Sequence, residues 1–441
     1  MKNIIMKFIN IFMSLFFAMT LISGNPTQNI KEYEVAYGWA KTSVNAVIFR
    51  QNSLVTHGEF QYIAFYDSTG YVILGKRKSG SEDWEIHKTQ YDGNVMDAHN
   101  VISIMVDGDG FIHMSWDHHG HRLNYCRSLR PESLEMGKKL SMTGEVERKV
   151  TYPQFYKMSN GDLLFVYRDG SSGNGNIVLN QYDLKKKEWQ QLHKNLIDGE
   201  GERNAYWQMY LDKNDVLHMS WVWRESGDVA TNHDMCYARS YDGGKTWQTS
   251  AGKAYSIPVN AENAEYAMRI PQKSDLINQT SMTADDSSNP YIATYYQDEY
   301  DPAPHVYIIY HNGDIWDRIK VGQRTMDFNL SGGGTRSIPI SRPIVLHTGN
   351  SGRSKLHVIY RDEEYGDKAC MKTIDLGMAG DWETTILTET GLDRWEPTFD
   401  TELWKMKGIL NLFIQEVGQG SGEKFVEMPP TMIRVLEIDK L

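Results

Sequence analysis

The feature that most constrains the fold of this chain is a short strand pattern that recurs seven times along it. Each copy is a turn followed by an apolar strand ending in an aromatic or large apolar residue. The copies end at Phe65, Trp116, Tyr167, Trp221, Tyr296, Tyr360 and Ile414, so successive copies are 51, 51, 54, 75, 64 and 54 residues apart. This period, with Gly, Asn and Asp turns between strands, is typical of a propeller. We therefore predict an all-β fold, a seven-bladed β-propeller with four-stranded antiparallel blades, whose ring leaves only short edges.

A second repeated feature is a tryptophan that closes a Gly-rich or charged turn late in five of the units: Trp84, Trp189, Trp247, Trp316 and Trp382. The turn before Trp247 reads Ser240-Tyr-Asp242-Gly-Gly244-Lys-Thr246-Trp247. This is the S-x-D-x-G-x-T-W Asp-box of bacterial sialidase-type repeats. We expect the Asp242 carboxylate to tie a hairpin turn through local hydrogen bonds. The motif indicates a propeller and says little about activity.

The N-terminal residues have the pattern of a secretion signal. Lys2 and Lys7 precede an apolar run over 8–22, and the small residues Ser23 and Gly24 follow it. The run is too short to be a good membrane span. We therefore predict a signal peptide over 1–24 and an exported protein, periplasmic or secreted, with 25–441 forming a single β-propeller catalytic domain. The cysteines are three and widely spaced, which predicts buried thiols and no disulfide framework: Cys126, Cys236 and Cys370.

The charge of the chain limits its ligands. A formal net charge of −11 argues against a broad nucleic-acid surface, which would need a basic stripe. An anionic ligand would therefore have to meet a local cluster of Arg, Lys or His side chains.

Blade topology predicts such a cluster. The innermost strand of a blade comes first and the second runs back, so the start of the first and the end of the second share a face. By this rule, residues of blades two, three and four converge at one mouth of the ring: His99, His119, Tyr152, Arg168, Tyr206 and Arg224. Such a pocket is cationic, titrates near neutral pH and can bind a carboxylate.

Structural interpretations remain open for several of these residues. His99 and His119 would also suit turn or core histidines, and Tyr152, which precedes a proline, a strand-start aromatic. Arg168 precedes Asp169, which suits a structural ion pair.

Histidines elsewhere have structural or metal-binding interpretations. His113, His218 and His357 occupy equivalent mid-strand positions in three blades, which predicts a structural role. The residue types would allow a structural metal ion at one of two sets, although neither spacing matches a closed zinc signature. These sets are His118 with His119 and His121, and His233 with Cys236. No cofactor is required for the chemistry that we expect.

The predicted cluster suits β-elimination at a uronic acid. This reaction removes the C5 proton and expels the 4-linked sugar, so it needs a base, an acid and cations that neutralise the carboxylate. His or Tyr can serve as base and acid, and Arg168 with a second His can stabilise the developing enolate charge. The paired carboxylates usual in glycoside hydrolysis are not evident among the strand-end residues.

The segments 97–100 and 116–125, together with the Asp-box and Tyr152-Pro153, resemble a BNR-repeat propeller family. This family includes family 25 polysaccharide lyases, which cut ulvan, and family 145 glycoside hydrolases. Both act at L-rhamnose-α-1,4-D-glucuronate linkages. The resemblance to the lyases implies catalytic roles for His99, His119, Tyr152 and Arg168. We also predict that Tyr206 and Arg224, from the same mouth of the ring, bind substrate.

The resemblance to the hydrolases implies a different site, on the opposite face and built around one histidine of the first blade. His57, in the hairpin of that blade, occupies the corresponding position. On this basis the sequence favours an exo-acting α-L-rhamnosidase that uses His57. The alternatives are an ulvan-lyase-type enzyme and a non-catalytic glycan-binding propeller. The expected partner is an acidic rhamnose- and glucuronate-containing glycan, and the expected state is a monomer.

Overall fold

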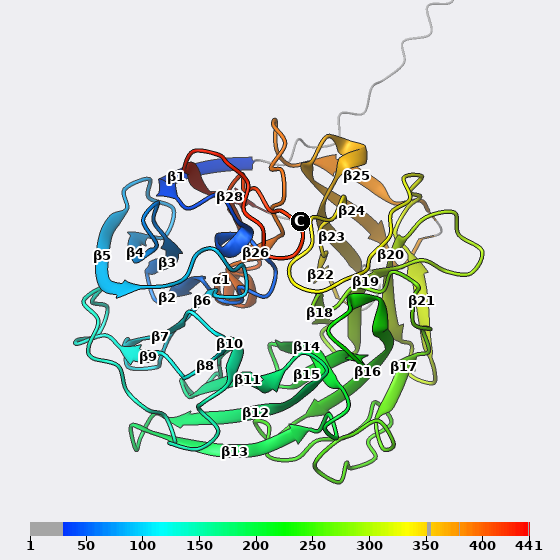
Figure 1. The fold of residues 1–441 in the computed structure, drawn as a ribbon, viewed down its shortest axis with the longest axis horizontal. Coiled ribbons are helices and arrows are strands. Elements are labelled where there is room, and N and C mark those ends of the chain that lie inside the picture. Colours follow the sequence, from blue (N-terminus) through cyan, green and yellow to red (C-terminus); the bar gives the residue numbers. More distant parts are fainter. Residues whose placement is uncertain (1–29, 351–353, 379, 440) are drawn as a thin grey trace, which may run out of the picture.

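The computed structural model describes residues 30–350, 354–378, 380–439 and 441, so the predicted signal peptide lies outside the described residues. Seven small antiparallel sheets surround a central axis, as Figure 1 shows from one end of the ring. The predicted seven-bladed propeller is confirmed. The seven repeated strand patterns are the second strands of the seven blades, so the repeat marked the same position each time.

The first three blades contain the strands from residue 54 to residue 197. Blade one consists of β2 (Leu54–His57), β3 (Phe60–Tyr66), β4 (Tyr71–Lys78) and β5 (Glu85–Asp92). Blade two consists of β6 (Ile102–Val106), β7 (Ile112–Trp116) and β9 (Tyr125–Arg127). Blade three consists of β10 (Val150–Lys157), β11 (Leu163–Ser171), β12 (Asn174–Asp183) and β13 (Glu188–Ile197), joined by β8 (His119–His121).

The next three blades each have four consecutive strands. Blade four consists of β14 (Asn204–Leu211), β15 (Leu217–Arg224), β16 (Asn232–Ser240) and β17 (Glu265–Met268). Blade five consists of β18 (Ser281–Ala284), β19 (Pro290–Tyr296), β20 (His305–His311) and β21 (Trp316–Lys320). Blade six consists of β22 (Ile344–Thr348), β23 (Lys355–Asp362), β24 (Lys368–Asp375) and β25 (Glu383–Ile386).

Blade seven joins the two ends of the described chain. It consists of β26 (Thr398–Phe399), β27 (Leu410–Ile414), β28 (Thr431–Ile438) and β1 (Ile30–Gly38). The pairing of β1 with β28 aligns Ile30 with Ile438 and closes the ring, and Figure 1 shows the two strands side by side. The short elements between strands are the helix α1 (Thr401–Lys407) and the 3-10 turns Ser43–Asn45, Val229–Thr231 and Glu363–Tyr365.

Blade two departs from the four-stranded pattern. The chain leaves β7 and forms β8, which pairs with β10 of the next blade instead of with its own sheet. Beyond β9, the outer edge is covered by an irregular segment. There, the amides of Gly137 and Leu140 donate to the carbonyls of Arg127 and Tyr125. This exchange carries His119 from blade two onto the inner edge of blade three.

The structural predictions for the repeat residues are confirmed. In the Asp-box, the Asp242 carboxylate accepts hydrogen bonds from the amides of Lys245 and Thr246 and from the Thr246 hydroxyl, over a buried Trp247. His113 and His218 are fully buried, and each bridges an aspartate and a tyrosine hydroxyl. The three cysteines are buried and free.

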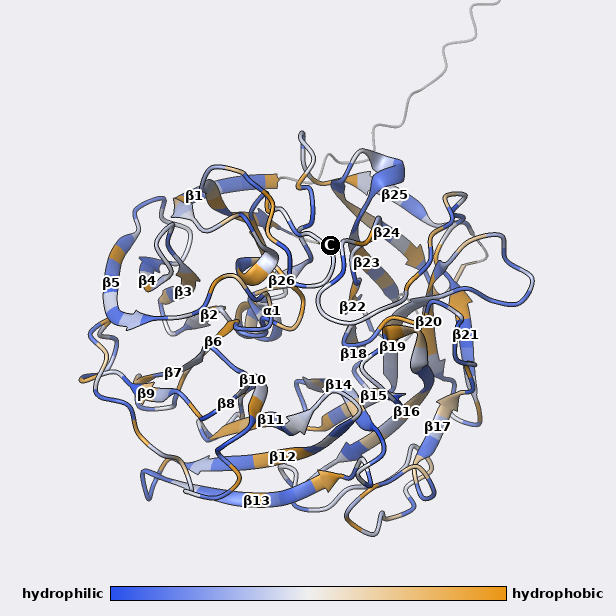
Figure 2. Cartoon of the chain, in the orientation of Figure 1, coloured by the Kyte–Doolittle hydropathy of each residue, from blue (hydrophilic) through white to orange (hydrophobic). Residues whose placement is uncertain are grey.

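Hydrophobic residues occur mainly in the strands, next to hydrophilic ones, whereas many of the loops around the ring are hydrophilic (Figure 2). The inner strands are buried on both faces between neighbouring blades, as in β7 and β15, where every residue is buried. Burying apolar area in this way stabilises the ring by roughly 25 cal/mol per Å². The described part of the chain has no helix long and apolar enough to cross a membrane.

Candidate active site

The six residues that the topology rule placed at one mouth do lie together. The rings of His99 and His119 stack at 3.9 Å between centroids, and Tyr152 lies 5.6 Å from His99 and 6.0 Å from Tyr206. The Arg168 guanidinium lies 5.1 Å from the Tyr152 ring. We call the end of the ring that carries this cluster the His99 face.

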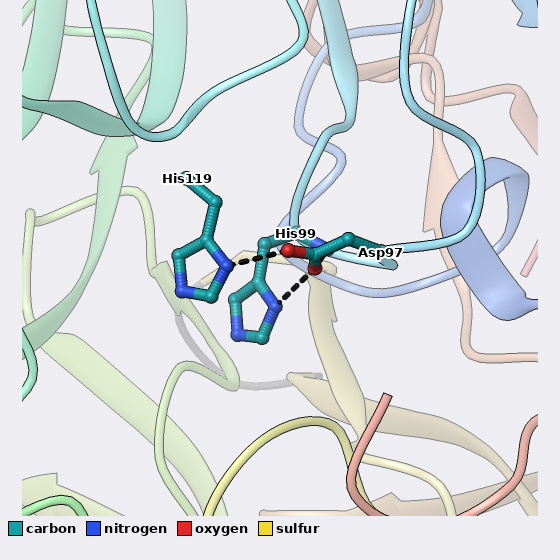
Figure 3. Close-up of side chains that lie close together, drawn as sticks. All are labelled: Asp97, His99 and His119. Atoms are coloured by element: carbon teal, nitrogen blue, oxygen red, sulfur yellow. Dashed lines mark hydrogen bonds and ion pairs between the residues drawn. The ribbon is translucent and has the colours of Figure 1, made fainter. Parts of the chain in front are cut away.

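One carboxylate holds both histidines. Asp97 contacts Nδ1 of His99 at 2.8 Å and Nδ1 of His119 at 2.6 Å, using a different oxygen for each. Figure 3 shows that the two Nε2 atoms point to the same side, away from Asp97. Asp97 was part of the motif that opens blade two, but the sequence analysis gave it no role. An orienting carboxylate of this kind sets the tautomer and leaves Nε2 free to react.

A second carboxylate reaches only one of the two histidines. Glu423, from the loop that precedes β28, lies 3.1 Å from Nδ1 of His99 and also accepts the Thr335 amide. Its other oxygen, Oε2, is buried without a hydrogen-bond partner among the described residues. Glu423 was missed by the sequence analysis, because it follows no repeat and is more than 300 residues from His99 in the chain.

This asymmetry separates the two imidazoles electrostatically. Burial favours the neutral form of His99, but its hydrogen bonds to Asp97 and Glu423 outweigh burial and raise its pKa to about 9. For His119, burial dominates over the Asp97 contact, and the neighbouring His99 adds to it, so the pKa is lowered. Near neutral pH the pair therefore holds one charged and one neutral imidazole, which suits an electrostatic role for His99 and a base role for His119.

The pKa values of the two tyrosines also differ. Burial raises a phenol pKa, but the charges of Arg224 and Arg168 outweigh it at Tyr206 and lower its pKa to about 8. Burial keeps the pKa of Tyr152 well above its ordinary value. Tyr152 also has a left-handed backbone with φ of 57°, at the bulge where β10 changes register. Strained conformations of non-glycine residues are concentrated at functional sites.

Arg168 is a buried cation that lacks a carboxylate partner in the described chain. It is 2% exposed, its Nε has no hydrogen-bond partner there, and its Nη1 reaches only the Tyr206 hydroxyl, at 3.5 Å. The structural pair with Asp169 does not form. Arg361, in the equivalent Tyr-Arg-Asp triplet of blade six, instead pairs with Asp367. A buried charge left unpaired is costly, so an anionic ligand would be stabilised beside Arg168.

Arg224 differs from Arg168 in its contacts. Its guanidinium lies 5.0 Å from the Tyr206 ring and donates to the carbonyls of Ser226 and Gly227. It therefore holds a loop and depresses the Tyr206 pKa. The substrate-binding role predicted for Arg224 and Tyr206 stays a prediction. Arg224 also lines a pocket together with His99 and Tyr152, and the other lining residues of this pocket include Phe49, Arg336 and Arg342.

The chain matches the pattern described as "BNR repeat-containing family member" over residues 60–324, more than half of its length. The chain belongs to this BNR repeat family. The short isoform of ulvan lyase from Alteromonas sp. (strain LOR) is 29% identical to it over 160 residues, covering 33% of this chain and 30% of the relative. A long isoform from Pseudoalteromonas sp. (strain PLSV) is 25% identical over 289 residues, covering 54% and 27%. The matches thus span less than a third of these relatives.

Solved structures show the same fold over nearly the whole BNR-repeat chain. The polysaccharide lyase Uly1 superposes with a TM-score of 0.66 at 15% identity, covering 93% of this chain and 99% of the other. A family PL25 ulvan lyase bound to -[GlcA(1-4)Rha3S]- superposes with a TM-score of 0.65 at 14% identity, covering 92% and 93%. At these identities the likeness shows the fold alone.

His57 lies at the opposite end of this BNR-repeat ring, as the sequence analysis placed it. Strand β10 begins beside His119 and ends at Lys157, whose Nζ is 3.5 Å from Nδ1 of His57. We call this end the His57 face. Burial and then the Lys157 charge lower the pKa of His57, so its imidazole is neutral near pH 7. Lys157 itself pairs with Glu402 at 3.3 Å.

The residue sets considered for a structural metal are differently engaged. The two ring nitrogens of His233 contact Glu225 and Asp234, and Cys236 is fully buried. In the other set, Nε2 of His118 accepts the Asn124 amide. Asp97, His99 and His119 do bring ligand-type atoms within 4.8 Å of one another. Their contacts have hydrogen-bond lengths, and we interpret them as an oriented histidine pair.

Proposed function

We propose that this protein is a polysaccharide lyase that cleaves rhamnose–glucuronate linkages by β-elimination on the His99 face. The observation that carries the proposal is the buried Arg168, which lacks a carboxylate partner and lies beside one charged and one neutral imidazole. The ulvan lyase relatives support the same choice. The proposal replaces the α-L-rhamnosidase that the sequence analysis favoured, because His57 has a lowered pKa and is therefore a poor proton donor to a leaving sugar.

In the proposed reaction, the uronate carboxylate binds between Arg168 and the His99 imidazolium. Their charges stabilise the enolate that develops when the C5 proton is removed. Nε2 of His119 takes that proton. The electron pair of the C5–H bond forms a C4–C5 double bond, and the bond from C4 to the leaving oxygen breaks.

The leaving oxygen takes a proton from a tyrosine. Tyr206 and Tyr152 are both protonated near pH 7, and the lower pKa of Tyr206 makes it the better acid. Solvent then returns the proton from His119 to the phenol. These steps use side chains of this chain alone and require no cofactor.

The deciding experiment incubates the protein with a rhamnose-α-1,4-glucuronate oligosaccharide. We expect ultraviolet absorbance from the unsaturated uronate product, and because the expelled sugar is rhamnose, a substrate that ends in rhamnose should release it in step with the absorbance. Free rhamnose without that absorbance would instead support the rhamnosidase at His57. Binding without turnover would support a glycan-binding propeller. Export of the protein, predicted from residues 1–24, and its monomeric state are part of the proposal and need separate measurement.

The Glu423→Gln substitution tests the charge assignment of the histidine pair. Removing this carboxylate removes a contact that favours the His99 imidazolium, so the pKa of His99 should fall. The midpoint of the His99 titration, followed by NMR of its imidazole, should then move to lower pH. This readout is chosen because Tyr206, with a pKa of about 8, sets the high-pH limb of the kcat/KM profile before His99 loses its proton. Glu427→Gln is the control, since Glu427 lies in the same loop and pairs with Lys41 at the surface. An unchanged or upward-shifted His99 midpoint in Glu423→Gln would contradict the assignment.

A further inference from the structure

A groove lies beside the proposed active site, between blades two and three. Two of its lining residues adjoin the site directly: Arg122 follows β8, which begins at His119, and Asp169 follows Arg168. The groove runs outward to Lys139 and Leu140, and the Leu140 amide donates to Tyr125 in the outer strand of blade two. It therefore lies at the His99 face and continues toward the outer strand of blade two.

The walls of this groove are basic although the protein is acidic. Its charged residues are Arg122, Lys139, Arg148, Lys149, Glu147 and Asp169. The Glu147 carboxylate is already occupied, because it accepts the amides of Thr143 and Gly144 and the Ser141 hydroxyl. Glu147 thus fixes the shape of the loop, which leaves Asp169 as the groove carboxylate set against four cations.

Three of the four cations are available to a ligand. Arg122, Arg148 and Lys149 are exposed and form no ion pair within the described part of the chain. Lys139 is held differently, with its Nζ bonded to Asn124 and lying 5.1 Å from the Trp116 ring. The floor between the cations is apolar, with Leu123 buried and Leu140 42% exposed. Cations above an apolar floor suit the acidic groups and the C–H face of a sugar.

The size of the groove excludes a single small ion as its natural occupant. Its volume is about 810 Å³, in the upper part of the roughly 300–1,000 Å³ range of pockets for drug-sized ligands. The space therefore has room for more than one sugar ring.

We propose that this groove binds anionic sugar units of the polysaccharide beyond the cleaved linkage, with Arg122, Arg148 and Lys149 contacting their sulfate or carboxylate groups. The proposal rests on the proposed function for the identity of the glycan. It also assigns the enzyme a polymeric substrate, because a disaccharide held at Arg168 would leave the groove empty.

The experiment compares Arg122→Gln/Arg148→Gln/Lys149→Gln with its parent, both carrying His119→Ala so that the glycan is not degraded. The ligands are ulvan, chemically desulfated ulvan and the rhamnose–glucuronate disaccharide. We expect the triple variant to bind ulvan about tenfold more weakly at low salt, with a smaller dependence of Kd on salt, because exposed ion pairs are individually weak but additive here. Disaccharide binding should not change.

The matched control is Lys185→Gln/Lys245→Gln/Lys253→Gln, which removes the same charge from exposed lysines in the outer turns of blades three and four. It should bind ulvan like the parent. Three results would contradict the proposed glycan-binding role of the groove: ulvan binding weakened equally in the two triple variants, disaccharide binding weakened in the groove variant, or no ulvan binding by the parent. If the parent and the groove variant bind desulfated ulvan equally well, the groove recognises sulfate groups. If the variant still binds desulfated ulvan more weakly than the parent, the groove recognises carboxylates.

Failure of the groove and failure of the proposed function give different results. If the wild-type protein forms unsaturated product but the groove variant binds ulvan normally, only the groove is wrong. If no unsaturated product forms and the groove variant still loses ulvan binding, only the proposed reaction is wrong.

Discussion

Replacing His119 with alanine is expected to reduce the formation of unsaturated product by about 10²–10⁴-fold, the usual contribution of a general base. The loss should appear in kcat. His119 takes the C5 proton only during the reaction, so its interaction with the substrate stabilises the transition state and not the bound substrate. His119 is partly exposed and lies in a short edge strand, so the thermal midpoint should change little. The measurement is the initial rate of ultraviolet absorbance increase at saturating substrate.

His57→Ala is the matched control for this result. It changes the same residue type in the same way on the other face of the ring, where His57 is half-buried beside Lys157. We expect it to retain the wild-type rate of unsaturated-product formation. The reverse pattern, with His57→Ala inactive and His119→Ala active in releasing rhamnose, would exclude the lyase and restore the hydrolase.

Replacing Arg168 with methionine should have opposite effects on activity and stability. Activity should fall by about 10²–10³-fold, as when one preorganised stabiliser of developing charge is removed. The free energy of unfolding should rise by about 1 kcal/mol, because the variant no longer buries a cation without a carboxylate partner. Product assays and urea unfolding measure the two effects.

The Arg168 prediction separates a ligand-binding role from a structural one. A structural arginine such as Arg361, which donates to Asp367 and to the carbonyls of Ile338 and Pro339, would lose stability on the same substitution. If Arg168→Met unfolds more easily than the parent, its buried charge supports the fold and the proposed carboxylate site is wrong. Partial rescue of activity by added guanidinium ion would strengthen the assignment.

The fold could be predicted because the same strand pattern recurs along the sequence at a similar spacing. Phe65, Trp116 and Tyr167 end equivalent strands, and every blade buries the same position against its neighbour, so one pattern is imposed seven times. The strand composition of blade two could not be predicted in this way, because β8 pairs with blade three instead of with its own blade. A three-residue strand leaves too short a pattern to show which neighbour it joins.

The candidate site was predictable to the extent that it depends on strand ends. His99 shortly precedes β6 and Arg168 lies in the last part of β11, and the propeller topology alone places them on one face. Glu423 depends on how a long loop of blade seven folds over the axis, and no local pattern encodes that path. The electrostatic division between His99 and His119 therefore became visible only in three dimensions.

The pairing of β1 with β28 also affects the order in which the protein folds. Tyr33 donates to Glu437 across 404 residues, so a nascent chain that lacks its last strand is an open arc with an unpaired edge at each end. Contacts of such sequence separation form late because loop closure must precede them. Glu423 belongs to the same final blade, so the His99 site gains its second carboxylate only as the circle closes. The charge arrangement around His99 is therefore completed as one of the last steps of folding.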